Sequence, residues 1–166
     1  MGQVVSQSEL ILYRGEWKRN GKGVVCIFGA FDLLHPGHIR LLEQARAHGD
    51  ILVVGVQSDA GMRALRASTG PAKQAPQRPI VPAAERMEIL AALAAVDYVV
   101  EYDEPTPASL VSRLAPDVVV EGGAEKRPVA AGQDRNKTSA PKIVRIPLEP
   151  GYSTTRLIER ISELRS

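Results

Sequence analysis

The stretch VVCIFGAFDLLHPGHIRLLEQARAHG, residues 24–49, decides the fold that the sequence predicts. Its first part is apolar on consecutive residues, which is typical of a parallel strand buried on both faces. Its last part places Ile39, Leu42 and Ala45 on one face of a helix that stops at Gly49. A strand followed by a helix indicates an α/β fold.

The same alternation continues to the end of the chain. Further strands are predicted in the runs DILVVGV, DYVVEY, DVVVEG and KIVRIPL, and further helices in AAERMEILAALAAV, ASLVSRLA and TTRLIERISELRS. Strands that alternate with helices imply right-handed crossovers and a parallel sheet covered on both faces. We therefore expect a single α/β domain of the Rossmann-like, doubly wound type over residues 24–166, preceded by an N-terminal extension over residues 1–23.

Composition argues against several classes of protein. The net charge is only +2, and no basic run is interleaved with aromatic residues, so nucleic-acid binding is not expected. The apolar runs are too short to span a bilayer and the N-terminus lacks a signal-peptide pattern, so we expect a cytoplasmic protein without a membrane partner. The single cysteine, Cys26, is expected in the core. The oligomeric state stays open, with a homodimer among the alternatives.

The turn after the first of these strands holds two of the three histidines of the chain, His35 and His38. Pro36 suits the first turn of a helix, where the amides that follow are unpaired and favour an anion. Both histidines project from that turn, so the segment offers several donors to one phosphate. The structural alternative is one capping and one surface histidine. Zinc is not favoured, because only His48 and Cys26 could complete a site.

Ligands of doubly wound sheets bind beyond the carboxyl ends of the strands. The segments that follow strands at this edge are the histidine turn, Ser58 with Asp59, residues 122–141 and residues 151–155. Two long connections, residues 66–82 and 122–141, are typical of lids, binding loops or disordered stretches.

These motifs resemble those of the cytidylyltransferase-like nucleotidyltransferases. GAFDLLHPGH resembles the family's H-x-G-H signature after its first strand, and GYSTTRLI resembles the S-T-T motif that opens its last helix. QSD at 57–59 and ERMEIL at 85–90 stand where the family has a strand-end Asp and an Arg in a helix. The run RPIVPAAERMEILAALAAVDYVV, followed by DVVVEGG, is most similar to the adenylyltransferase that acts on heptose 1-phosphate in ADP-heptose synthesis, for lipopolysaccharide precursors.

The resemblance implies a reaction and a set of site residues. An NTP, with ATP favoured and CTP as the alternative, would transfer its nucleoside monophosphate to a phosphorylated small-molecule acceptor such as a sugar 1-phosphate and release pyrophosphate. Mg²⁺ would arrive with the nucleotide, and His35 and His38 would act as catalytic donors to the leaving phosphates. The implied nucleotide-binding residues are Gly29, Ala30, Phe31, Asp32, Gly37, Asp59, Arg86, Gly122, Ser153, Thr154 and Thr155.

Several of these residues have a purely structural alternative. Asp32 could order the turn, Asp59 could cap a helix, and Arg86 could be a solvated surface residue. Ser153 or Thr154 could cap the last helix. No activated nucleophile is needed, because the acceptor phosphate is itself nucleophilic.

The chain departs from the heptose subfamily after the fourth of these strands. That subfamily reads K-G-G-D-Y, whereas this chain reads EGGAE, so Glu121, Ala124 and Glu125 replace Lys, Asp and Tyr. Three basic residues that follow are predicted to hold the acceptor phosphate instead, unless they belong to a solvated segment: Lys126, Arg127 and Arg135. Failing that, the phosphate site is expected near Arg63, Arg66 and Arg78.

Two other functions stay open. Glycerol 3-phosphate cytidylyltransferases place an Arg before S-T-T where this chain has Leu148, which counts against that subfamily. The EGGAE segment would also fit a nucleotide-binding module with little turnover.

Overall fold

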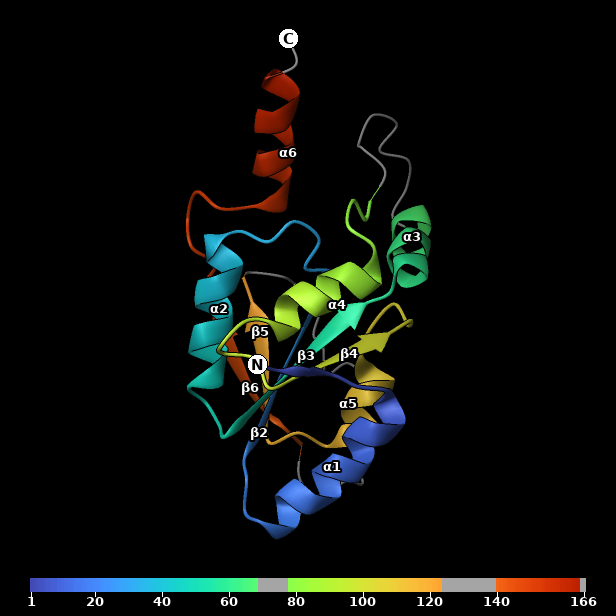
Figure 1. The fold of residues 1–166 in the computed structure, drawn as a ribbon, viewed down its shortest axis with the longest axis vertical. Coiled ribbons are helices and arrows are strands. Elements are labelled where there is room, and N and C mark those ends of the chain that lie inside the picture. Colours follow the sequence, from blue (N-terminus) through green and yellow to red (C-terminus); the bar gives the residue numbers. More distant parts are fainter. Residues whose placement is uncertain (69–77, 124–139, 165–166) are drawn as a thin grey trace.

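The computed structural model describes residues 1–68, 78–123 and 140–164, which form a six-stranded parallel sheet with helices on both faces (Figure 1). The strands are β1 (Gln3–Val4), β2 (Val24–Gly29), β3 (Ile51–Gln57), β4 (Tyr98–Tyr102), β5 (Val118–Gly122) and β6 (Lys142–Ile146). The helices are α1 (Gln7–Arg19), α2 (Pro36–Arg46), α3 (Asp59–Ser68), α4 (Ala83–Ala91), α5 (Ala108–Leu114) and α6 (Thr154–Glu163). The strand order is β1-β4-β3-β2-β5-β6, which confirms the doubly wound Rossmann-like fold.

The residues of β2 point alternately into two separate cores. Val25 and Ile27 pack with α2 and α4, whereas Val24 and Cys26 pack with α1 and α5. Because helices cover both faces, a strand in the middle of the sheet must be apolar on consecutive residues. Cys26 is fully buried, and this burial raises the pKa of its thiol.

Residues 1–23, expected as an extension, contribute two elements to this unit. β1 pairs in parallel with β4 at the edge of the sheet. α1 begins with a capping box formed by Ser6 and Glu9 and buries Leu10 and Trp17 in the second core. Neither element was predicted from the sequence. Strand pairing ties β1 to the rest of the sheet, and the burial of Leu10 and Trp17 does the same for α1.

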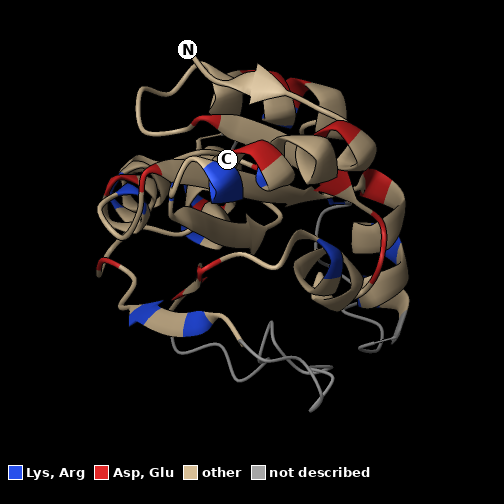
Figure 2. Cartoon of the chain, turned by 90° about the horizontal axis from the view of Figure 1, so that it is seen from below, with Lys and Arg blue, Asp and Glu red and all other residues tan. Residues whose placement is uncertain are grey.

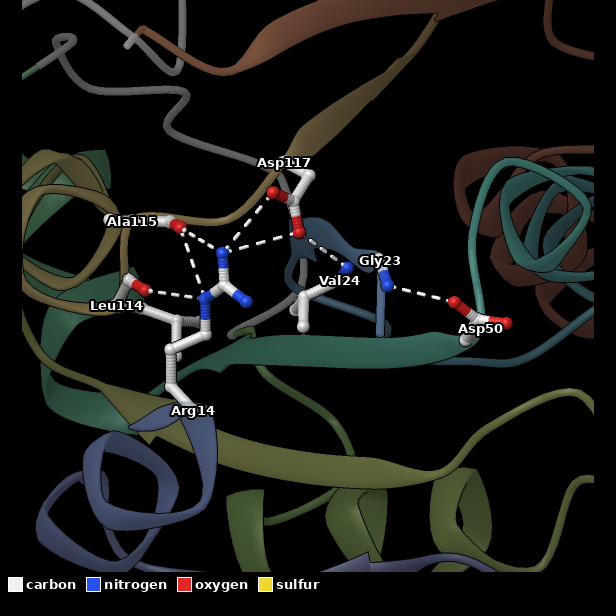
Figure 3. A network of polar contacts seen from close by, with 7 residues as sticks. All are labelled: Arg14, Gly23, Val24, Asp50, Leu114, Ala115 and Asp117. Carbon is white, nitrogen blue, oxygen red and sulfur yellow. Dashed lines mark hydrogen bonds and ion pairs between the residues drawn. The ribbon is translucent and has the colours of Figure 1, made fainter. Parts of the chain in front are cut away.

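A polar network fastens α1 to the amino-terminal edge of the sheet (Figure 3). The guanidinium of Arg14 donates to the carbonyl oxygens of Leu114 and Ala115, at 3.3 and 3.0–3.2 Å, and so caps the end of α5. It also pairs with Asp117 at 3.2 Å, and that carboxylate accepts the amide of Val24 at 2.8 Å. One side chain therefore links α1, α5 and the first residue of β2.

Lys and Arg as well as Asp and Glu are spread over the elements drawn in Figure 2. Within residues 1–68, 78–123 and 140–164, no helix has both the length and the apolar character needed to cross a membrane.

We predict that Arg14→Met lowers the free energy of unfolding by about 1–3 kcal/mol, because two carbonyl groups and one carboxylate lose their charged donor. Urea denaturation measures this. Arg19→Met, an exposed arginine of the same helix, is the matched control and should change the value by less than about 0.5 kcal/mol. Equal stability of the two variants would contradict the role of the network.

Candidate active site

The candidate site lies at the carboxyl edge of β2, where the strand order reverses. From β2 the chain proceeds to β3 and β4, and it later returns to β5 on the other side of β2. In open α/β sheets this switch point forms a crevice for ligands. The Oγ1 hydroxyl of Thr154 donates to the carbonyl of Leu33 at 3.3 Å, which holds the start of α6 beside the histidine turn.

The two histidines form a stacked pair at the start of α2. His35 is the N-cap of the helix, Pro36 is its first residue, and the Nδ1 atom of His35 accepts the amide of His38 at 3.3 Å. The two ring centroids are 3.8 Å apart with 18° between the planes. A Cβ atom at Gly37 would lie 3.1 Å from the His35 ring and from Cβ of Tyr152. Glycine therefore leaves room for the ring and for the β6–α6 connection.

Burial sets the protonation of this pair. Desolvation lowers the pKa of His35, and desolvation together with the charge of His35 lowers the pKa of His38 to about 4. Both rings are consequently neutral near pH 7. Because Nδ1 of His35 is an acceptor, the proton of its neutral ring resides on Nε2, which can donate to a ligand. The buried Nδ1 of His38 has no hydrogen-bond partner among the described residues.

A cavity of about 810 Å³ opens beside this turn, between α3 and α6. Ala30 and Gln57, at the ends of β2 and β3, form part of its wall, and Thr155 of α6 forms another part. Arg78 also lines it and donates to the hydroxyl of Thr155 at 3.3 Å. Its size suits a small-molecule ligand. Ala30 and Thr155, two of the expected nucleotide contacts, thus line this cavity, together with Arg78, which was a second choice for the phosphate site.

Arg86 occupies a different position from the phosphate contact that we expected. Its side chain is fully buried, and Nε donates to the carbonyl of Val81 at 2.9 Å. Nη1 donates to the carbonyls of Gln57, at 3.0 Å, and Ala30, while Nη2 pairs with Asp59 at 2.6 Å. In this structure the guanidinium joins the ends of β2 and β3 to the start of α3, and Asp59 is its counter-ion.

Asp32 and Phe31 shape the turn between β2 and α2. One carboxylate oxygen of Asp32 accepts the amides of Ile80 and Val81 at 2.8 and 2.9 Å. Its other oxygen is buried and has no partner among the described residues. Phe31 has a positive φ of 47°, and its ring lies where a Cβ atom at Gly29 would be 3.1 Å away. Strained backbone of this kind is common at functional sites.

Two other predicted residues have local structural roles. Ser153 is the N-cap of α6, and its hydroxyl accepts the amide of Arg156 at 3.1 Å. Gly122 ends β5, and a Cβ atom there would lie 2.7 Å from a methyl group of Leu41.

The residue that departs from the heptose subfamily, Glu121, is buried at the end of β5 and pairs with Arg145 of β6 at 3.1 Å. The negative charge is therefore compensated within the sheet. The predicted acceptor contacts, Lys126, Arg127 and Arg135, lie outside the described residues and stay predictions, as do the roles of Ala124 and Glu125.

Three aromatic and ionic contacts beside the histidines were not predicted from the sequence. The Tyr152 ring lies 6.3 Å from the His35 ring, centroid to centroid, and 5.5 Å from the guanidinium carbon of Arg40. Arg40 also pairs with Glu149. The position of Tyr152 next to the S-T-T motif was the available signal, whereas nothing in the sequence pairs Arg40 with it.

We predict that the imidazole of His38 titrates with a pKa of about 4 in the free protein, measured by NMR with His38→Gln to assign the signal. In the unfolded chain His38 has the ordinary pKa of 6.5, so the unfolded chain takes up the proton at a higher pH than the folded chain does. The contribution of His38 to stability is therefore lost as the pH falls from 6.5 to about 4. Added tripolyphosphate should raise the pKa, because an anion favours the imidazolium. A free-protein pKa near 6.5 would contradict the burial of this ring.

Arg86→Met is expected to lower the free energy of unfolding by about 3–5 kcal/mol, because it leaves a carboxylate and three carbonyls without their shared donor. Urea denaturation measures the loss. Arg86→Lys should recover only part of it, since an ammonium cannot reproduce the planar fork. Normal stability with weakened polyphosphate binding would instead favour the phosphate contact that the sequence suggested.

Comparison with known proteins finds relatives that match most of this chain. Curated relatives include the "Bifunctional protein HldE" of Koribacter versatilis, 43% identical over 95% of this chain and 31% of that protein. The protein of the same name from Syntrophotalea carbinolica is 44% identical over 87% of this chain and 28% of that protein. The chain thus spans less than a third of the length of these relatives.

Solved structures show the same fold. The "lipopolysaccharide core biosynthesis protein" of Thermoplasma volcanium is 29% identical, with a TM-score of 0.62 over 78% of this chain and 99% of that one. Pantoate-beta-alanine ligase of Francisella tularensis is 14% identical with a TM-score of 0.58, a likeness of fold alone. The sequence model described as "Cytidylyltransferase-like" matches residues 26–160, which include the histidine turn and the start of α6. The chain therefore belongs to the cytidylyltransferase-like family of nucleotidyltransferases.

Proposed function

We propose that this protein transfers AMP from ATP to the phosphate of a sugar 1-phosphate, such as heptose 1-phosphate, and releases pyrophosphate. The observation that carries the proposal is the stacked pair of neutral histidines at the start of α2, beside the start of α6. The names of the relatives, a bifunctional HldE protein and a lipopolysaccharide core biosynthesis protein, favour a sugar phosphate as acceptor.

The reaction needs donors rather than a nucleophilic side chain. An acceptor phosphate oxygen attacks the α-phosphorus of the nucleotide, the bond from that phosphorus to the α–β bridging oxygen breaks, and pyrophosphate leaves with the extra negative charge. The Nε2–H of His35 and the amino-terminal ends of α2 and α6 supply positive potential for that charge. A preorganised donor of this kind contributes about 3–4 kcal/mol in acyl-transfer enzymes.

Mg²⁺ belongs to the substrate in this proposal. Within the described residues there is no group of three His, Cys, Asp or Glu side chains placed to hold a metal ion. We therefore expect the phosphates themselves to supply most ligands of the ion that accompanies the nucleotide. Our candidate for a further ligand is Asp32, which lies in the turn that leads to the histidines and has one carboxylate oxygen without a partner among the described residues.

The ion pair between Glu121 and Arg145 at the end of β5 helps to decide between an active enzyme and a nucleotide-binding module with little turnover. That alternative rests on Glu121, because an anion in place of a lysine would repel phosphate. In the structure Glu121 has Arg145 as a partner at 3.1 Å, so the reversal of charge is offset locally. This observation favours an active enzyme over a module without turnover.

The test is pyrophosphate release from ATP or CTP with Mg²⁺, screened against heptose 1-phosphate, other sugar 1-phosphates and glycerol 3-phosphate. We expect turnover with ATP and a sugar 1-phosphate, with sequential kinetics because no covalent enzyme intermediate forms. His35→Ala or His38→Ala should lower kcat by about a hundredfold and change nucleotide affinity less. Preference for CTP with glycerol 3-phosphate would support the cytidylyltransferase alternative, and no release with any pair would support the binding module.

A further inference from the structure

The rings of the histidine turn and of the β6–α6 connection contact one another in a row. The Phe31 ring lies 5.5 Å from the His38 ring, centroid to centroid, and the His38 and His35 rings are stacked at 3.8 Å. The Tyr152 ring continues the row at 6.3 Å from His35, with 23° between the planes. The guanidinium carbon of Arg40 lies 5.5 Å from the centre of the Tyr152 ring, within the range of a cation–π contact. The row of contacts therefore has an aromatic ring on each side of the histidine pair.

Tyr152 is held by contacts that lie on both sides of it along the chain. Arg40 pairs with Glu149, which precedes Tyr152, and also lies against the Tyr152 ring. Gly151 has a φ of 91°, which glycine adopts readily, and the side chain that follows this turn reaches His35. Thr154 donates to a carbonyl of the β2–α2 turn at 3.3 Å. The ring is 39% exposed, so these tethers, rather than deep burial, hold it in place.

The imidazole of His35 needs a neighbour of this kind. Its Nδ1 accepts the amide of His38 at 3.3 Å, which is long for a hydrogen bond and limits the tilt of the ring only weakly. A Cβ atom at Gly37 would lie 3.1 Å from the His35 ring and 3.1 Å from Cβ of Tyr152, so both side chains close on the same point of the helix backbone. A hydrogen bond weakens steeply as its angle worsens, so the tilt of this ring decides what its Nε2–H contributes to a ligand.

We propose that Tyr152 is a positioning residue for His35: its ring, held by Arg40, keeps the imidazole in the tilt in which Nδ1 faces the His38 amide and Nε2 faces the ligand. This deepens the proposed function and rests on it for the identity of the ligand. A donor that is already aimed at the leaving phosphates needs no reorientation as charge develops there. Without the Tyr152 ring, the imidazole rotates more freely, and part of its population presents the wrong nitrogen or the wrong angle.

The tautomer of His35 tests this without turnover. At about pH 8, where an unperturbed histidine is also neutral, the parent should show the well-separated ¹⁵N chemical shifts of a pure Nε2–H tautomer, with His35→Gln to assign the signals. In Tyr152→Leu the two shifts should move toward each other, because a free ring populates both tautomers. Tyr152→Phe keeps the ring and should give the shifts of the parent. Parent-like shifts in Tyr152→Leu, or an equal change in Tyr152→Phe, would overturn the proposal.

Turnover separates positioning from substrate binding. Tyr152→Leu should lower kcat for pyrophosphate release at least about tenfold and change KM for ATP less than about twofold, because a misaimed donor costs rate rather than affinity. Tyr152→Phe should keep kcat within about threefold of the parent. A raised KM with unchanged kcat in Tyr152→Leu would make Tyr152 a surface on which the substrate stacks, and would refute the positioning role.

Arg40→Met tests the anchor of the ring. Arg40 and Tyr152 are both exposed, so variants at either position should fold. Loss of the guanidinium should release the Tyr152 ring, shift the His35 nitrogens in the same direction and lower kcat at least about threefold. The matched control is Arg19→Met at the exposed end of α1, which should equal the parent in both measurements. Parent-like shifts and kcat in Arg40→Met would refute the role of Arg40, and if Tyr152→Leu does not fold, that result would refute the whole proposal.

The outcomes separate this inference from the proposed function. A changed His35 tautomer in Tyr152→Leu, in a protein whose parent form releases no pyrophosphate from any substrate pair, would refute the proposed reaction and keep the positioning role. Turnover by the parent, with parent-like shifts and kcat in Tyr152→Leu, would keep the reaction and refute the positioning role.

Discussion

A single buried guanidinium determines how the segments around the candidate active site meet. Arg86 donates to the carbonyls of Ala30 and Gln57 at the ends of two adjacent strands, and it pairs with Asp59 at the start of α3. A cation in the interior is costly unless its donors are satisfied, so these partners must assemble together or not at all. The crevice at the switch point therefore takes its shape from a group that does not contact solvent.

The sequence predicted the central strands because burial on both faces leaves a direct mark, apolar residues in succession, as in Val24 to Ile27. It did not predict β1 or α1. β1 is only two residues long and both are exposed, while α1 buries little beyond Leu10 and Trp17, so neither has a strong periodic signal. Their places depend on contacts with β4 and α5, which lie about a hundred positions away along the chain.

Part of the candidate site was also predictable from the sequence. The turn around Pro36 predicted that His35 and His38 would project from one helix start, and they do. The direction in which a long side chain points was not predictable from the sequence. From the sequence, Arg86 could bind a phosphate or be solvated at the surface, and neither alternative placed it in the interior, where its carbonyl partners hold it.

The short first strand has a consequence for the behaviour of the molecule in solution. β1 occupies the outer edge of β4, and α1 packs against Tyr98 of the sheet and Leu110 of α5. Without β1 and α1, the edge of β4 would carry unpaired backbone N–H and C=O groups next to exposed apolar side chains. Such an edge is a template on which another chain can add a strand. β1 and α1 thus protect the sheet against aggregation, although they lie far from the candidate active site.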